Sequence, residues 1–153
     1  MNRSEIRVVK RQLEGYLDYL ELAKQAEEKA AELEKRYEAM AGLRCVPLTK
    51  NDSGKNSGMK PDHTSRFLEI FGEQDELLKQ AETYRAKAWR IQKFISEAIP
   101  EDKRQAFKSV YLNGFPVKVA ALGLNCTESS VRKVVDSALL AVSSAAAKKF
   151  GLL

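Results

Sequence analysis

The 153-residue sequence has few of the residues that metal binding, disulfide formation or export require. It contains one histidine, His63, and two cysteines, Cys45 and Cys126, which lie far apart in the chain. A zinc site needs more ligands than these, so we expect reduced cysteines and no metal. No run of about 18 apolar residues occurs, and the N-terminus lacks the apolar core of a signal peptide. These absences predict a cytoplasmic protein with no membrane partner.

Residues for catalysis are equally scarce. A catalytic site needs a nucleophile with a base, paired carboxylates in a cleft or a phosphate-binding loop, and no usable spacing of these occurs. The segment Ser53-Gly54-Lys55 is superficially similar to a phosphate loop, but no strand precedes it and the glycine spacing is absent. We therefore expect no enzyme activity, no catalytic residues and no cofactor.

The sequence has only four prolines, and two long segments without interior proline show helical spacing. From about Ser4 to Met40 apolar residues recur three or four apart. They are Ile6, Val9, Leu13, Tyr16, Leu20, Ala23, Ala26, Ala30, Leu33, Tyr37 and Met40. A second seam runs from about His63 to Ile99, with Phe67, Ile70, Gln74, Leu77, Ala81, Tyr84, Ala88, Ile91, Ile95 and Ala98. The pattern predicts a long, coiled-coil-like antiparallel hairpin over residues 1–99, with a polar loop at about 42–62.

Four more apolar residues of the second segment widen its seam, namely Phe71, Leu78, Trp89 and Phe94. The second helix is therefore expected to contact more than one neighbour. Pairing within one chain, pairing in a homo-oligomer or both would satisfy this pattern. We expect Trp89 to pack in the apolar stripe and not to stack on bases.

Residues 100–153 have the pattern of a separate domain, with Pro100 as the expected hinge and a first helix from Glu101 to Asn113. A short helix is expected after Pro116, with one apolar face formed by Val117, Ala120, Ala121 and Leu124. Asn125 tolerates a positive φ in the following turn, Cys126 is expected in the core, and Thr127 is suited to cap the next helix. That helix has apolar residues at Val131, Val134, Val135, Ala138 and Val142, and Ser143 to Lys149 are expected to extend it. The whole pattern predicts an all-α protein that ends in a helix-turn-helix domain.

The charge distribution favours a polyanionic partner for this domain. The net charge is +5, and residues 100–153 hold eight Lys or Arg against four Asp or Glu. Seven residues of the second helix and its cap are expected to face bases in a major groove: Thr127, Glu128, Ser129, Ser130, Arg132, Lys133 and Asp136. Five residues are expected nearer the phosphates: Arg104, Lys108, Lys118, Lys148 and Lys149. A solvated helix that never meets DNA has the same pattern.

The same region carries a family resemblance. The residues that carry it are Tyr111 to Gly114, Ala120, Ala121, Leu124 to Val131, Ala138 and Leu139. In this pattern the chain resembles phage-encoded transcriptional regulators of the ArpU type, which are similar to region four of bacterial sigma factors. The resemblance implies a helix-turn-helix that binds promoter or late-gene control DNA in a Gram-positive host. Ser129 departs from the basic residue usual in the family, and Pro116-Val117 replaces its serine-aromatic helix start.

Three functions are compatible with the sequence. The first is a dimeric transcription regulator that binds double-stranded DNA in the cytoplasm of a bacterial host. The second is an oligomeric phage assembly or packaging adaptor, similar to a small terminase. The third is a protein that binds RNA polymerase. Molecular mass in solution discriminates the first from the second, because a ring has many more subunits than a dimer.

Overall fold

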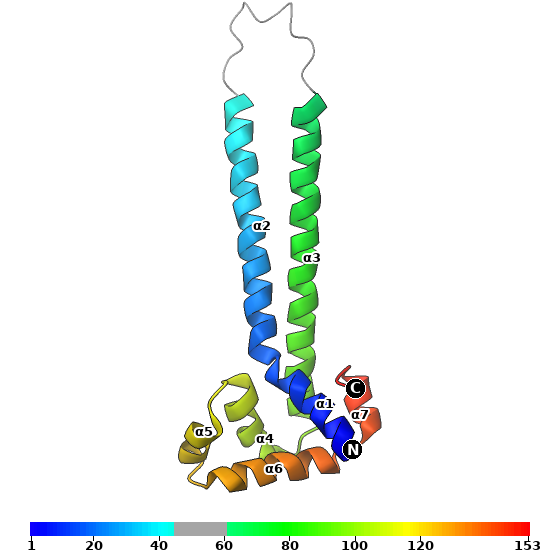
Figure 1. Cartoon of the computed structure of the whole chain (residues 1–153), viewed down its shortest axis with the longest axis vertical. Helices are drawn as coiled ribbons and strands as arrows, with labels where there is room; N and C mark the ends of the chain where they lie inside the picture. The colour runs from blue at the N-terminus through cyan, green and yellow to red at the C-terminus, as the bar shows by residue number, and fades with distance from the viewer. Residues whose placement is uncertain (45–60) are drawn as a thin grey trace, which may run out of the picture. The chain divides into compact units, whose positions relative to one another are not determined.

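The computed structural model describes residues 1–44 and 61–153, and within these ranges it contains helices and no strand. In chain order they are α1 (Arg3–Glu14), α2 (Tyr16–Arg44), α3 (Pro61–Glu97), α4 (Glu101–Phe107), the π-helix η2 (Lys108–Leu112), α5 (Val117–Gly123), α6 (Glu128–Ala141) and α7 (Ser144–Lys149) (Figure 1). The predicted all-α class is confirmed. Cys45, the side chain of His63 and most of the predicted loop at about 42–62 lie outside the described residues.

The described chain forms two compact units. One consists of residues 1–21 with residues 84–153, and the other of residues 22–83. The sequence predicted a domain boundary after residue 99, whereas the compact units are divided after residues 21 and 83. The reason is that α1 and the end of α3 pack into the same core as the C-terminal helices.

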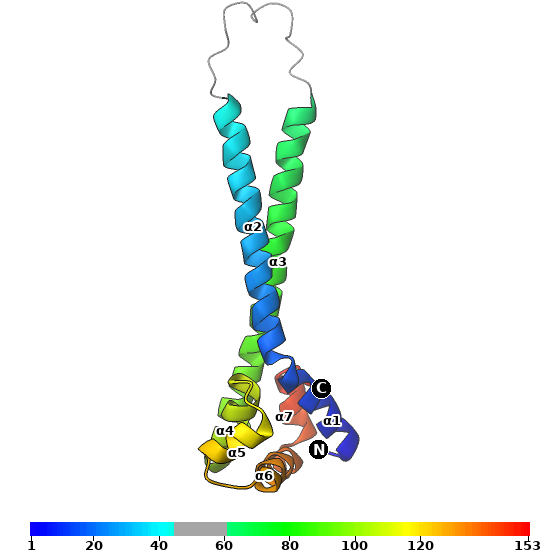
Figure 2. The same cartoon turned by 60° about the vertical axis from the view of Figure 1, so that its left-hand side comes forward.

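In the unit of residues 22–83, α2 and α3 run side by side in antiparallel directions (Figures 1 and 2). The Tyr37 ring, late in α2, contacts Phe67 and Phe71, early in α3, at centroid distances of 5.2 and 4.7 Å. Elsewhere along the two helices the alanines of both seams are buried, namely Ala23, Ala26, Ala30 and Ala81. Small buried residues let the helix backbones approach closely, and the predicted long hairpin is confirmed.

The unit of residues 1–21 and 84–153 has one core, to which almost every helix contributes. Its buried members are Ile6, Val9, Leu13, Tyr16, Ala88, Ile91, Phe94, Ile95, Ile99, Phe107, Tyr111, Val135, Ala138, Leu139, Val142, Ala147 and Leu152. Ile99 is 1% exposed and adjoins Pro100, which begins the turn into α4. Pro100 therefore redirects the chain within one core and is not the hinge between two units.

Glycine interrupts the first long helix, which the sequence predicted to be continuous from Ser4 to Met40. The Gly15 N–H donates to the Gln12 carbonyl at 3.2 Å, so α1 ends here and α2 begins at Tyr16. Glycine lowers helix stability because its backbone is freer in the unfolded chain. Leu20 was predicted to lie in the seam but is 37% exposed, and Tyr19 instead stacks on Tyr84 with centroids 6.4 Å apart.

Two further expectations about helix ends and packing are corrected. The last helix does not extend from α6 through Ser143, because Val142 is extended and the Ser143 hydroxyl caps a new helix, α7. Trp89 is 58% exposed and does not pack in the core, and the Lys93 ammonium lies 5.3 Å from its ring centroid. Of the four seam-widening residues, only Phe94 is fully buried.

Candidate nucleic-acid interface

The turn between α5 and α6 has the local features that the sequence predicted. Asn125 adopts a positive φ of 53°, and the Thr127 hydroxyl accepts a hydrogen bond from the Ser130 N–H at 3.2 Å. Helices α5 and α6 pack against each other through the buried Ala120, Ala121 and Val131. Cys126 was expected in this core but is exposed, because the alanines and Val131 already fill the space between the helices.

Helix α6 has a buried apolar face and an exposed polar face. Val131, Val135, Ala138 and Leu139 are buried. Six of the seven predicted base-facing residues on α6 and its cap are exposed, namely Thr127, Glu128, Ser129, Arg132, Lys133 and Asp136. Ser130 is half-buried. The described part of the chain therefore leaves Arg132 and Lys133 accessible, which groove binding requires.

Several of these polar groups already have partners. Arg132 lies 3.8 Å from Glu128 in an exposed pair one helical turn apart, which stabilises a helix by only about 0.2–0.5 kcal/mol. Asp136 forms an ion pair with Lys10 of α1. The Thr127 hydroxyl also lies 2.8 Å from the Ser130 hydroxyl, so its oxygen is used in capping. Because the pair of Arg132 with Glu128 is long and exposed, its loss on binding another group costs little free energy.

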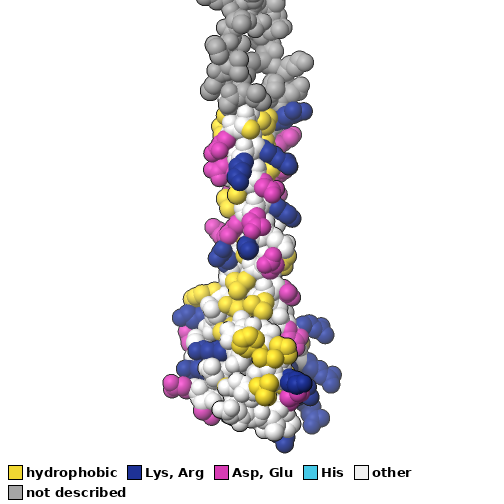
Figure 3. Space-filling model, turned by 90° about the vertical axis from the view of Figure 1, so that its left-hand side faces the viewer, with side chains coloured by type: hydrophobic (Ala, Val, Ile, Leu, Met, Phe, Trp, Pro, Cys, Tyr) yellow, Lys and Arg dark blue, Asp and Glu magenta, His cyan; other side chains and the backbone are white. Residues whose placement is uncertain are grey.

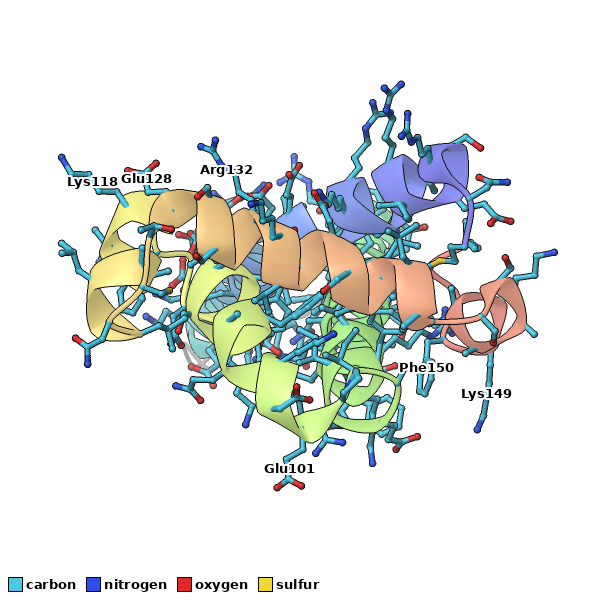
Figure 4. All side chains as sticks on the ribbon, turned by 90° about the horizontal axis from the view of Figure 1, so that it is seen from below. Glu101, Lys118, Glu128, Arg132, Lys149 and Phe150 are labelled. Carbon is cyan, nitrogen blue, oxygen red and sulfur yellow. The ribbon has the colours of Figure 1, made fainter. Side chains whose placement is uncertain are left out.

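The predicted phosphate-contacting residues do not share one face. Lys118, Glu128 and Arg132 lie along one edge of the unit seen in Figure 4, whereas Lys149 extends toward the opposite edge. Arg104 donates from Nε to the Ile99 carbonyl at 2.8 Å and so closes the end of the preceding turn. Of the three cations Lys118, Arg104 and Lys149, only Lys118 lies beside the exposed face of α6.

A groove of about 490 Å³ separates the start of the chain from α5 and α6 within this unit. Lys10, Glu14 and Arg132 stand among its lining residues, together with Tyr111. Burial raises the pKa of Tyr111 to about 12, and the negative charges of Glu14 and Asp136 contribute to this rise. The groove therefore places charged groups of α1 beside those of α6.

The sequence interpretation missed the cations of α1. Arg3, Arg7 and Arg11 are exposed, and Lys10 is half-buried beside Asp136. The net charge of residues 1–41 does not reveal them, because the acidic residues of α2 balance these cations. The spacing of the three arginines, four residues apart on one helix face, was the signal that identifies them. Figure 3 shows Lys and Arg side chains gathered at one side of the unit that contains α1.

Gly114 lies in the turn that leads into α5, with a φ of 67°. A Cβ at this position would overlap the Leu17 side chain. We expect Gly114→Ala to lower the free energy of unfolding by about 1–3 kcal/mol, because a left-handed backbone is unfavourable for alanine. Urea unfolding measures this change.

Gly123 provides the matched control for Gly114. It lies in α5, and an added Cβ would have no neighbour within 4 Å. Gly123→Ala should leave stability unchanged or raise it by up to about 1 kcal/mol, because alanine favours helix. Equal destabilisation by the two substitutions would contradict the role assigned to Gly114.

The chain matches no protein-family model, no curated protein and no solved structure in the comparisons made. The resemblance to ArpU-type regulators therefore stays a prediction. Among the described residues, no group of three or more metal-ligating side chains occurs. Within the same residues, no helix has the length and apolar character needed to cross a membrane.

Proposed function

We propose that this chain is a sequence-specific regulator of transcription that binds double-stranded DNA, with α6 in the major groove. The observation that carries the proposal is the exposed polar face of α6, where Arg132 and Lys133 are accessible. Arg132 lies along the same edge of the unit as Lys118 of α5 (Figure 4). The α5–turn–α6 arrangement supports it, because helix-turn-helix proteins insert the second helix of such a pair into the groove.

The charges of the two helices suit different parts of a duplex. Arg132 projects from the first half of α6, the part of a recognition helix that contacts base edges. Its guanidinium can donate two hydrogen bonds to a guanine, and its weak exposed pair with Glu128 offers little competition. Lys118 lies on the neighbouring helix and suits a phosphate, which increases affinity without reading sequence.

Replacement of Arg132 by alanine tests the proposal. DNA retained by the wild-type protein from a random pool is sequenced first, and binding to single-base variants of the selected duplex is then compared. Arg132→Ala should relax selectivity at one base pair by about 1–3 kcal/mol. Absence of any preferred sequence for the wild-type protein would reject the proposal.

Lys118→Ala should behave differently. It should weaken binding to all sequences alike and reduce the slope of log affinity against log salt by about one unit. In the proposed docking Lys149 does not face the duplex, so Lys149→Ala is the matched control and should leave the slope unchanged. A wild-type slope for the Lys118 variant would remove Lys118 from the phosphate contacts.

An oligomeric packaging adaptor is the second candidate, and one observation favours it. Leu68 and Leu78 of α3 are 67% and 43% exposed in the unit of residues 22–83, and Phe71 is 46% exposed. Large exposed apolar side chains on one helix suit self-association. A dimer in analytical ultracentrifugation supports the regulator, and a many-membered ring supports the adaptor. Co-purification with RNA polymerase in the absence of DNA binding would instead support a polymerase partner.

A further inference from the structure

Helix α1 carries a row of cations on its exposed side. Arg3, Arg7 and Arg11, here called the arginine stripe, follow one another at four-residue intervals and are all exposed. The described residues provide no ion pair to any of the three. At 1.5 Å per residue the stripe extends for about 12 Å along the helix. Two carboxylates, Glu14 of α1 and Asp18 at the start of α2, line the groove beyond the end of the stripe.

Two contacts, one before the first turn of α1 and one within the helix, hold α1 along α6. The N-terminal ammonium of Met1 donates to the Val142 carbonyl at 2.9 Å, and Lys10 pairs with Asp136. Farther along the same direction, Lys10 and Glu14 line one groove with Arg132. The two helices therefore run antiparallel, and the stripe lies beside the polar face of α6.

A third contact fixes the start of α1 to α7. The Ser144 hydroxyl donates to Glu5 at 2.8 Å, and the Asn2 N–H donates to the same carboxylate oxygen at 2.9 Å. The Asn2 and Ser144 hydrogen bonds hold the pKa of Glu5 below its usual range. Because α1 is fastened in this way, the stripe is presented by a positioned helix and not by a free arm.

We propose that the arginine stripe of α1 is a second DNA-contacting surface, which binds the phosphate backbone beside the groove that α6 enters. This inference rests on the proposed function. The axes of packed helices are about 8–10 Å apart. The centre of a major groove about 12 Å wide is only about 6 Å from the phosphates at its edge, so a helix packed beside one in the groove lies beyond that edge. With α6 in the groove, α1 therefore lies over the bordering phosphates.

The direction of the side chains agrees with this placement. In Figure 4 nitrogen-tipped side chains of α1 extend toward the same edge as Lys118, Glu128 and Arg132. Arginine suits phosphate because its guanidinium is always charged and donates two parallel hydrogen bonds. The stripe thus supplies the phosphate contacts that Lys149, on the opposite edge, does not supply in this docking.

The salt dependence of binding to the selected duplex tests the inference. Changing all three arginines of the stripe to glutamine should reduce the slope of log affinity against log salt by about 2–3 units, since each phosphate contact contributes about 0.9. Changing them to lysine should retain most of the slope. The single Arg7→Gln change, with an expected loss of about one unit, serves if the triple variant does not fold.

The matched control removes the same charge from the other unit. Lys29, Lys35 and Arg36 are exposed on α2, and their triple replacement by glutamine should leave the slope close to wild type. Equal slopes for the stripe variant and this control would overturn the inference. The inference would also be overturned if the stripe variant lost the wild-type protein's binding to phosphatidylserine vesicles but kept the wild-type DNA slope. That result would assign the stripe to a membrane surface.

Arg132→Ala separates failure of this inference from failure of the proposed function. If that variant loses base selectivity while the stripe variant keeps the wild-type slope, the regulator stands and the stripe does not contact DNA. If the wild-type protein binds no DNA, both proposals fail. A reduced slope with unchanged base preference is the result that supports the stripe.

Discussion

Phe107→Ala is expected to lower the free energy of unfolding by about 3–5 kcal/mol, the range for removing a buried aromatic ring. Phe107 is 0% exposed, and its ring centroid lies 5.7 Å from that of Tyr111. It ends α4 and faces the core to which α1, α3 and α6 all contribute. Because small domains have only about 5–15 kcal/mol of stability, this loss is a large fraction of the total.

Phe115→Ala is the matched control for that measurement. Phe115 is the same residue type in the same unit, but it is 47% exposed. Its truncation should cost less than half as much, because less apolar area is withdrawn from water. Denaturant unfolding followed by circular dichroism measures both variants, and equal losses would place Phe107 outside the common core.

High pH is expected to destabilise the protein through Tyr111. Burial raises the pKa of Tyr111 to about 12, and the negative charges of Glu14 and Asp136 make smaller contributions in the same direction. A tyrosine in an unfolded chain has a pKa near 10. The neutral phenol is therefore favoured by folding. Its contribution is fully present below about pH 10 and is lost as the pH rises toward 12, by up to about 2–3 kcal/mol.

Tyr111→Phe isolates this effect, because phenylalanine keeps the ring and cannot ionise. Unfolding free energies of wild type and variant are compared at about pH 9 and about pH 12. The wild-type protein should lose about 2–3 kcal/mol more than the variant between these values. Parallel losses in the two proteins would show that another group controls alkaline unfolding.

Local features were predicted well because short-range chemistry decides them. Asn125 at the positive-φ position and Thr127 as helix cap act through their own backbone and its nearest turn. The seam of α3 followed from residue spacing, with Phe67, Ala81 and Ala88 all buried as expected. None of these features depends on which distant segment supplies the opposite surface.

Errors arose where two local preferences competed. Gly15 ends α1 although the apolar pattern continues through it. Leu20 was predicted to lie in the seam but is exposed, and its neighbour Tyr19 contacts α3 instead by stacking on Tyr84. The segment after Phe107 forms a π-helix, with the Asn113 N–H donating to the Lys108 carbonyl at 2.9 Å. A π turn has one extra residue, and periodicity read from sequence does not distinguish it from an α turn.

The sequence by itself determined an all-α chain, the two long helical seams and the capped, polar face of α6, because residue spacing and capping chemistry act within a few turns. Only the tertiary structure decided that α1 joins α6 and α7, through Met1 to Val142 and Lys10 to Asp136. Those contacts join residues more than a hundred positions apart. Such pairing depends on the complementarity of surfaces that exist only after the helices have formed, and it is what places the arginine stripe beside the candidate interface.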